Sequence, residues 1–101
     1  MKITIDIPEL KTERLILRGP RPDDWEDDAA FRTSERARYI GGPYDRMIAW
    51  RNFAARWGHW AIRGYGMFTV TMRGSDAPLG VVGPLFAEGW LEPELGWVLY
   101  E

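Results

Sequence analysis

The sequence predicts an α+β fold in which an antiparallel sheet of about four strands is covered by two main helices. Three observations favour it. Apolar side chains recur at three- and four-residue spacing between Asp45 and Gly64, which is typical of an amphipathic helix. Strand-like segments then follow one another from Met67 to the end of the chain, and another such segment precedes the helices. Helices that lead into a strand meander indicate an antiparallel sheet with the helices packed on it.

Composition narrows the class of protein. The chain has 101 residues, of which 46% are apolar and 28% charged, as in one soluble globular domain. The net charge of −2 gives no electrostatic argument for binding nucleic acid or an anionic membrane. There is no cysteine and only one histidine, His59, which argues against a metal site and a conventional Ser-His-Asp triad. With no signal peptide and no long apolar run, we expect a cytoplasmic protein.

Two strand-like segments open the chain. Ile3, Ile5 and Ile7 alternate with polar residues, which is typical of a half-buried strand. Residues 12–18 (TERLILR) form the second segment, and glycine and proline break it at residues 19–22. The two segments are interpreted as one extended arm that leads into the first true strand.

The first helix is expected to begin at Pro22. Proline at the start and acidic residues in the first turn suit the positive end of the helix dipole. The acidic residues are interpreted as helix capping and a solvated face; they are Asp23, Asp24, Asp27 and Asp28. A short helical turn is expected from Ser34 to near Tyr39, before glycine and proline break the chain at residues 41–43.

The second helix has the clearest pattern. Asp45 is the expected N-cap, and Gly64 and Gly66 the expected stop. The predicted core face consists of Met47, Trp50, Phe53, Ala54, Trp57 and Ala61. The predicted polar side carries Arg46, Arg51, Asn52, Arg56 and Arg63. His59 is expected on or near the helix surface.

The rest of the chain predicts a meander. Residues 67–73 form a strand, and residues 79–86 form its hairpin partner, with a kink or bulge expected at Gly83. A loop carrying Trp90 leads to the last strand, within residues 92–101. Gly96 interrupts that apolar strand, and such a glycine indicates a bulge or a close approach by a ligand. The chain stops one residue after the apolar run, so we expect an incomplete domain.

Several of these segments together resemble the GNAT-superfamily N-acetyltransferases, in the branch similar to ribosomal-protein N-acetyltransferases. They are residues 12–18 followed by 22–24 (PDD), residues 38–43 (RYIGGP), and residues 79–80 (LG) followed by 94–99 (ELGWVL). These segments are distributed over almost the whole chain and follow the family's order. The resemblance implies an N-terminal half of a GNAT fold, within one partial domain that spans residues 1–101.

The resemblance also implies acetyl transfer from acetyl-CoA to a primary amine. In this family a bulge in the fourth strand exposes backbone groups that hold the cofactor, which places Trp97, Val98 and Leu99 nearest the thioester. Glu94 matches an acidic position where some relatives keep a general base; a solvated strand end or a salt bridge is the alternative role.

Other implied features concern the substrate and the cofactor phosphates. Tyr39, Tyr44 and Trp90 are candidates to line the amine pocket; a peptide N-terminus, an antibiotic amine and a small metabolite all remain open as substrates. The family's pyrophosphate loop, Gln/Arg-x-x-Gly-x-Gly/Ala at the start of a helix, has no counterpart in these residues. We therefore expect the chain alone to be inactive.

Two other functions remain open. A non-catalytic interaction module would pair through the last strand, from Leu95 to Tyr100, as a homodimer or a swapped dimer. An α+β domain that binds a small molecule or lipid is suggested only by the aromatic content of six Trp, four Tyr and four Phe.

Overall fold

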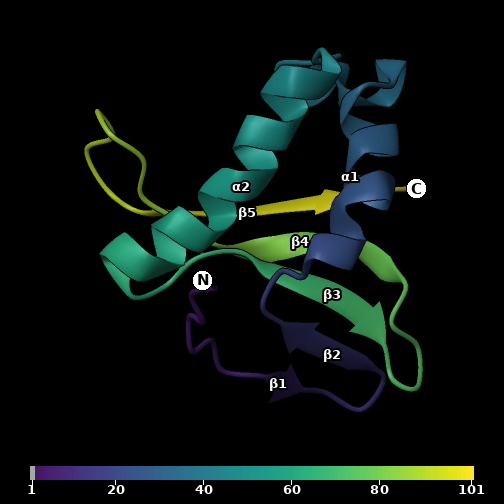
Figure 1. Ribbon diagram of the computed structural model, residues 1–101, viewed down its shortest axis with the longest axis vertical. Helices are drawn as coiled ribbons and strands as arrows, with labels where there is room; N and C mark the ends of the chain where they lie inside the picture. Colours follow the sequence, from purple (N-terminus) through teal and green to yellow (C-terminus); the bar gives the residue numbers. More distant parts are fainter. Residues whose placement is uncertain (1) are drawn as a thin grey trace.

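The computed structural model describes residues 2–101, in which five antiparallel strands form one sheet in the order β1-β2-β3-β4-β5. The strands are β1 (Leu10–Lys11), β2 (Leu15–Arg18), β3 (Phe68–Met72), β4 (Pro78–Leu85) and β5 (Glu94–Leu99). Figure 1 shows them side by side, with β1 and β5 at the two edges. The predicted α+β antiparallel architecture is confirmed. The strand count exceeds the expected number because β1, only two residues long, pairs with β2.

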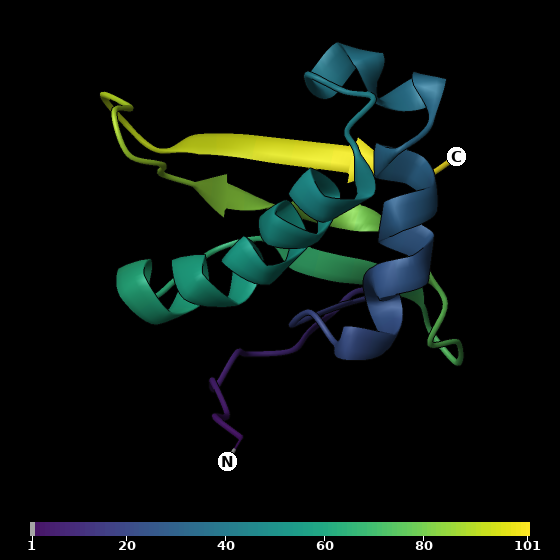
Figure 2. The ribbon, with the colours of Figure 1, turned by 45° about the horizontal axis from the view of Figure 1, so that its top comes forward.

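Two helices cover one face of this sheet. They are α1 (Trp25–Arg32) and α2 (Arg46–Arg63), and both lie over the strands in Figure 2. Short 3-10 helices precede each of them, η1 (Pro22–Asp24) and η2 (Glu35–Ile40), and η2 confirms the expected turn of helix. Gly41 ends η2 with a left-handed φ of 97°, a conformation that favours glycine.

Both predicted caps of α2 are confirmed. The Asp45 carboxylate accepts a hydrogen bond from the backbone N–H of Ile48 at 2.9 Å, which satisfies one of the free donors at the helix start. At the other end Gly64 adopts φ 78° and donates its N–H to the Trp60 carbonyl at 2.9 Å. Local sequence chemistry therefore sets both ends of the longest helix.

The predicted core face of α2 is wrong in part. Phe53 is buried as expected, but Met47 and Trp50 are 62% and 54% exposed. The residues that α2 buries are Ala49, Phe53, Arg56 and Trp60. Apolar side chains surround most of this helix, so their spacing alone does not say which stripe faces the sheet. The buried stripe includes Arg56 because a carboxylate meets it there, as described below.

Two expectations about the strands are also wrong. Residues 3–7 form no strand; Ile7 instead packs over Gly19, where any Cβ would crowd it. The register between β3 and β4 shifts at one point: Val70 pairs with Gly80, but Thr71 pairs with Pro78. Leu79 therefore has no partner in β3. The bulge therefore lies at the start of β4, away from the predicted position at Gly83.

The last strand is regular. Every residue of β5 has a partner in β4, from Glu94 opposite Leu85 to Leu99 opposite Gly80, so the bulge expected at Gly96 does not occur. Glycines in β4 serve close packing of backbones: a Cβ at Gly80 would clash with the Val98 carbonyl, and one at Gly83 with the Gly66 carbonyl.

Candidate functional site

The acidic residues at the start of the helical layer divide into two kinds. Asp23 and Asp27 are exposed, as predicted. Asp24 and Asp28 are 2% and 0% exposed, so their interpretation as a solvated face is wrong. A buried carboxylate needs a charged partner and hydrogen bonds to offset its desolvation, and each of the two has an arginine.

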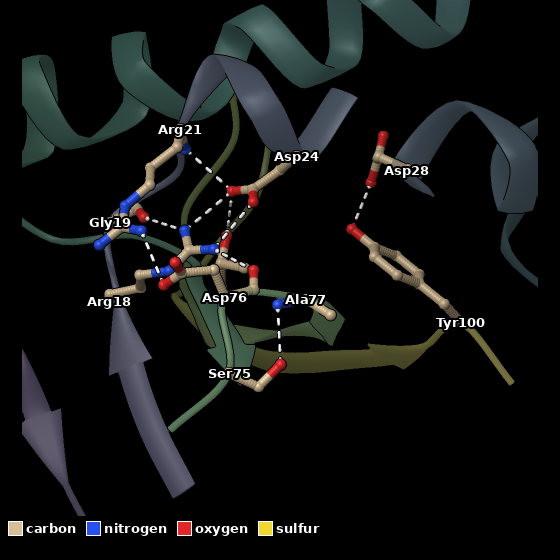
Figure 3. Close-up of polar contacts among 10 residues, drawn as sticks. Arg18, Gly19, Arg21, Asp24, Asp28, Ser75, Asp76, Ala77 and Tyr100 are labelled. Atoms are coloured by element: carbon tan, nitrogen blue, oxygen red, sulfur yellow. Dashed lines mark hydrogen bonds and ion pairs between the residues drawn. The ribbon is translucent and has the colours of Figure 1, made fainter. Parts of the chain in front are cut away.

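Asp24 pairs with Arg18 in a bidentate geometry. The two terminal guanidinium nitrogens donate to the two carboxylate oxygens at 2.9 and 2.8 Å, and Figure 3 shows the pair. Asp24 also accepts from the backbone N–H of Arg21 at 2.9 Å, and Arg18 donates to the carbonyls of Gly19 and Asp76. The pair joins the end of β2 to η1 and to the β3–β4 turn.

Asp28 is the centre of a second buried group. One of its oxygens, Oδ1, accepts from the Tyr100 hydroxyl at 2.6 Å and from Arg56 Nη2 at 2.5 Å. Figure 3 shows the Tyr100 phenol pointing at this carboxylate. Arg32 Nε lies 3.6 Å from the same oxygen. This group, called the Asp28 cluster below, brings together α1, α2 and the residue that follows β5.

Burial and charge set the protonation states in the cluster. Burial raises the pKa of Tyr100 above its ordinary value, with the Asp28 charge adding to it and Arg56 opposing it. For Arg56, burial is the largest single influence and lowers the pKa, but the electrostatic interactions with Asp28 and Tyr100 and the hydrogen bonds to both together outweigh it, so the pKa is raised. Tyr100 is therefore a protonated donor and Arg56 a cation throughout the physiological range of pH.

Strand β5 presents a free backbone edge. The Tyr100 N–H donates to the Leu79 carbonyl of β4 at 2.9 Å. Because hydrogen-bonded and non-hydrogen-bonded pairs alternate in an antiparallel ladder, the N–H and C=O groups of Leu95, Trp97 and Leu99 point away from β4. Within residues 2–101 no strand pairs with that edge, so these groups are available to a ligand or another chain.

The predicted cofactor residues divide between the two faces of β5. Val98 packs inward against Phe31 and Tyr100. Trp97 and Leu99 lie on the opposite face and are 68% and 61% exposed. Glu94 is the first residue of β5 and is exposed. A groove of about 660 Å³ lies at the C-terminal end of the strand, lined among others by Leu99 and Tyr100.

The predicted substrate residues are brought together only in part. Trp90 and Glu94 line one hollow of about 360 Å³, together with Leu91 and Glu92. Tyr39, in η2, is 82% exposed, and its hydroxyl accepts from Arg38 at 2.8 Å. Tyr44 folds back and donates its hydroxyl to the Ile40 carbonyl at 2.5 Å. Neither of these tyrosines lines that hollow.

His59 connects α2 to β4 and does not lie free on the helix surface. Its Nδ1 lies 2.8 Å from the Tyr65 carbonyl, and its Nε2 accepts from the Phe86 N–H at 2.9 Å. Only the neutral ring with its proton on Nδ1 satisfies both contacts. With both nitrogens engaged by backbone groups, this histidine serves the fold.

The Asp28 cluster was missed from the sequence, although a signal for it exists. Asp24, Asp28 and Phe31 recur at helical spacing and form a buried stripe. Arg56 falls midway between the apolar Phe53 and Trp60 on the same face of α2. An acidic residue and a basic residue inside two facing apolar stripes indicate a buried ion pair.

Residues 2–101 contain neither a cluster of metal-binding side chains nor a helix suited to span a membrane. No group of three histidine, aspartate or glutamate side chains there is arranged to hold a metal ion. None of the helices in the same residues has both the length and the apolar character needed to cross a membrane.

Comparison with known families agrees with this fold. The family model described as the acetyltransferase (GNAT) domain matches residues 14–101, which is most of the chain. The chain belongs to the GNAT acetyltransferase family. A comparison with curated proteins finds no matching relative.

Three solved acetyltransferase structures resemble the chain over part of their own length. An acetyltransferase from Agrobacterium tumefaciens str. C58 is 33% identical, with a TM-score of 0.88; the match covers 100% of this chain and 59% of that protein. A protein described as a GNAT-family acetyltransferase from Bordetella pertussis is 23% identical, with a TM-score of 0.75, over 93% of this chain and 59% of that one. A GNAT-family acetyltransferase from Bacillus anthracis is 21% identical, with a TM-score of 0.68, over 91% and 53%. The chain thus spans little more than half the length of these structures.

Proposed function

We propose that this GNAT chain takes part in acetyl transfer from acetyl-CoA to a primary amine, with β5 as the strand that holds the cofactor. The observation that carries the proposal is the free edge of β5, where the backbone groups of Trp97 and Leu99 face away from β4. Edge groups of this kind bind an extended ligand through main-chain hydrogen bonds. Acetyl-CoA would supply the activated acetyl thioester.

Glu94 is proposed as the general base. It lies at the start of the same strand, is exposed, and lines a hollow with Trp90 that is open to an incoming amine. A base must reach the ammonium proton before the neutral amine can attack a thioester. Trp90 is proposed to contact the substrate there. Tyr39 and Tyr44 remain candidates for the same role, with less support because they line no part of that hollow.

The fit to the cofactor is partial, since β5 pairs regularly with β4 and has no bulge, and no residues match the family's pyrophosphate loop. We therefore propose that the 101-residue chain alone binds acetyl-CoA weakly and turns over little. A cytoplasmic location also remains a proposal and is supported by composition alone.

Titration of acetyl-CoA into the purified chain by calorimetry tests the cofactor site. Trp97→Pro removes the N–H that points to the free edge, whereas Trp97→Ala keeps it; proline is tolerated on an edge strand when its N–H would face outward. We expect Trp97→Ala to keep most of the affinity and Trp97→Pro to lose it. Equal affinities of the two variants would show that the backbone N–H of residue 97 takes no part in binding. A folded wild-type chain that does not bind acetyl-CoA would overturn the cofactor proposal.

The base is tested by turnover of a primary-amine substrate. Glu94→Gln is expected to lower kcat on the order of 100-fold or more without weakening acetyl-CoA binding. Glu88→Gln, an exposed charge in the preceding loop, is the matched control. Equal rates in the two variants would show that Glu94 is a solvated strand end.

A second candidate function rests on a different observation. Leu95, Trp97 and Leu99 are 66%, 68% and 61% exposed on one face of the edge strand. Such an edge favours pairing with another copy, so the alternative is an interaction module that forms a homodimer or swapped dimer through residues 95–100. Sedimentation of the wild type and of the Leu95→Lys variant tests this alternative. A dimer dissociated by the lysine supports the module, and a wild-type monomer at high concentration excludes it.

A further inference from the structure

All the polar groups of Tyr100 are held, each by a different element. Its hydroxyl donates to Asp28 of α1 at 2.6 Å, and its N–H donates to the Leu79 carbonyl of β4 at 2.9 Å. Its carbonyl accepts from Arg36 Nη1 of η2. The ring packs against Phe31, with 5.7 Å between the two centroids. Tyr100 is 8% exposed, so water does not replace these partners freely.

The partner of the hydroxyl is itself held in place. Asp28 is fully buried, and the oxygen that accepts from Tyr100 also accepts from Arg56 of α2 at 2.5 Å. A hydrogen bond to a charged group is stronger and more directional than one between neutral groups. Arg56 of α2 donates to this oxygen, and Arg32 of α1 lies 3.6 Å from it, so contacts other than Tyr100 also hold the carboxylate in place.

This anchor lies at the end of an edge strand. Tyr100 directly follows Leu99, the last residue of β5, and the strand has a neighbour on one side only. Edge strands fray more readily than central ones, because a single ladder holds them. Arg36 and Asp28 hold the chain from the helical layer just beyond the residues whose backbone faces the free edge. The contacts therefore stabilise the end of the strand that the proposed cofactor would use.

We propose that Tyr100 is a positioning residue: held by Asp28 and Arg56, it fixes the C-terminal end of β5 against α1 and keeps the backbone edge at Trp97 and Leu99 in place for acetyl-CoA. The part concerning acetyl-CoA rests on the function proposed above. The anchoring of β5 is measurable without a ligand. A tyrosine that merely filled the core would stabilise the whole domain evenly.

Amide hydrogen exchange in Tyr100→Phe tests the anchor. The variant keeps the ring against Phe31 and removes only the hydroxyl. We expect the backbone amides of Val98 and of residue 100, which face β4, to exchange at least tenfold faster than in the wild type. The amides of β3 should be nearly unchanged. Tyr65→Phe removes the hydroxyl of a tyrosine whose ring packs against His59 at 5.6 Å between centroids; it is the control and should leave β5 unchanged. Equal acceleration of β3 and β5 would overturn the proposal.

Two further measurements separate this inference from the proposed function. Asp28→Ala combined with Tyr100→Phe should speed exchange in β5 no more than Asp28→Ala alone, because alanine already removes the acceptor of the Tyr100 hydroxyl; additive effects would contradict the anchor. Where the wild type binds acetyl-CoA, Tyr100→Phe should raise the Kd at least fivefold and Tyr65→Phe should not. If the wild type does not bind acetyl-CoA, the proposed function is contradicted. The exchange data still decide whether Tyr100 anchors β5.

Discussion

The two buried arginine–aspartate pairs of this chain use the same residue types at similar burial and hold different things together. Arg18 and Asp24 are six residues apart and meet through two parallel hydrogen bonds, reinforced by neighbouring backbone groups. Arg56 and Asp28 are 28 residues apart and meet through one oxygen, which also accepts from Tyr100, 72 residues from Asp28. The first pair joins the end of β2 to η1, and the second connects both helices to the residue after β5. Figure 3 shows the first pair and the contact of Asp28 with Tyr100.

This difference teaches that burial of an ion pair does not reveal its role. A bidentate pair with both oxygens engaged is rigid, and its removal should destabilise the whole domain. A pair that shares one oxygen with a distant tyrosine is a connection between elements, so its removal should have a local signature. Three predictions sharpen the contrast.

The largest effect is expected for Asp24→Ala. It leaves the Arg18 guanidinium buried without its carboxylate, which should lower the free energy of unfolding by about 3–5 kcal/mol. Urea denaturation measures it, with Asp23→Ala as the matched control; that exposed neighbour should cost less than about 1 kcal/mol. Similar losses in the two variants would mean that the buried pair contributes no more than an ordinary first-turn charge.

Asp28→Asn should cost less, about 2 kcal/mol, because the amide oxygen still accepts from Tyr100 while the charge opposite Arg56 is lost. Asp27→Asn, exposed and one residue away, is its control. The contrast with Asp24→Ala lies in the distribution of the loss, which amide exchange should show in β5 and not in β2. A uniform loss across the sheet would make the two pairs equivalent.

The smallest effect concerns pH. Burial raises the pKa of Tyr100 in the folded state, so above about pH 10 the unfolded chain releases a proton that the folded chain retains. The unfolded state then binds fewer protons, and the free energy of unfolding falls as pH rises. It should fall by about 1.4 kcal/mol more between pH 9 and pH 11 in the wild type than in Tyr100→Phe. Parallel curves from urea titrations would show that Tyr100 ionises equally in both states.

Prediction from sequence succeeded where the determining contacts are local. Asp45 and Gly64 were assigned correctly as the caps of α2, since a cap needs only a side chain or a left-handed residue a few positions from the helix end. Alternation and turn residues located β3, β4 and β5. The family resemblance, carried by several short segments in order, is confirmed by the match over residues 14–101.

Prediction failed where a residue's environment comes from a distant segment. Apolar spacing predicts Trp50 and Met47 in the core, but both are exposed, because spacing alone cannot choose between overlapping stripes on one helix. The local pattern predicts Asp28 on a solvated face, because its partners lie 28 and 72 residues away. The proposed roles of Glu94, Trp97, Val98 and Leu99 remain predictions. The structure adds that β5 is a regular edge strand, with Trp97 and Leu99 outward and Val98 inward.

The sequence by itself determined the fold class, the family and both ends of α2, because periodicity and capping depend on residues within a few positions of each other. Only the tertiary structure decided which face of α2 is buried, which acidic residues are charged and buried, and how Tyr100 joins β5 to the helices. These depend on desolvation and pairing across the chain, where the free energy of a buried charge is set by a partner that the local sequence does not reveal.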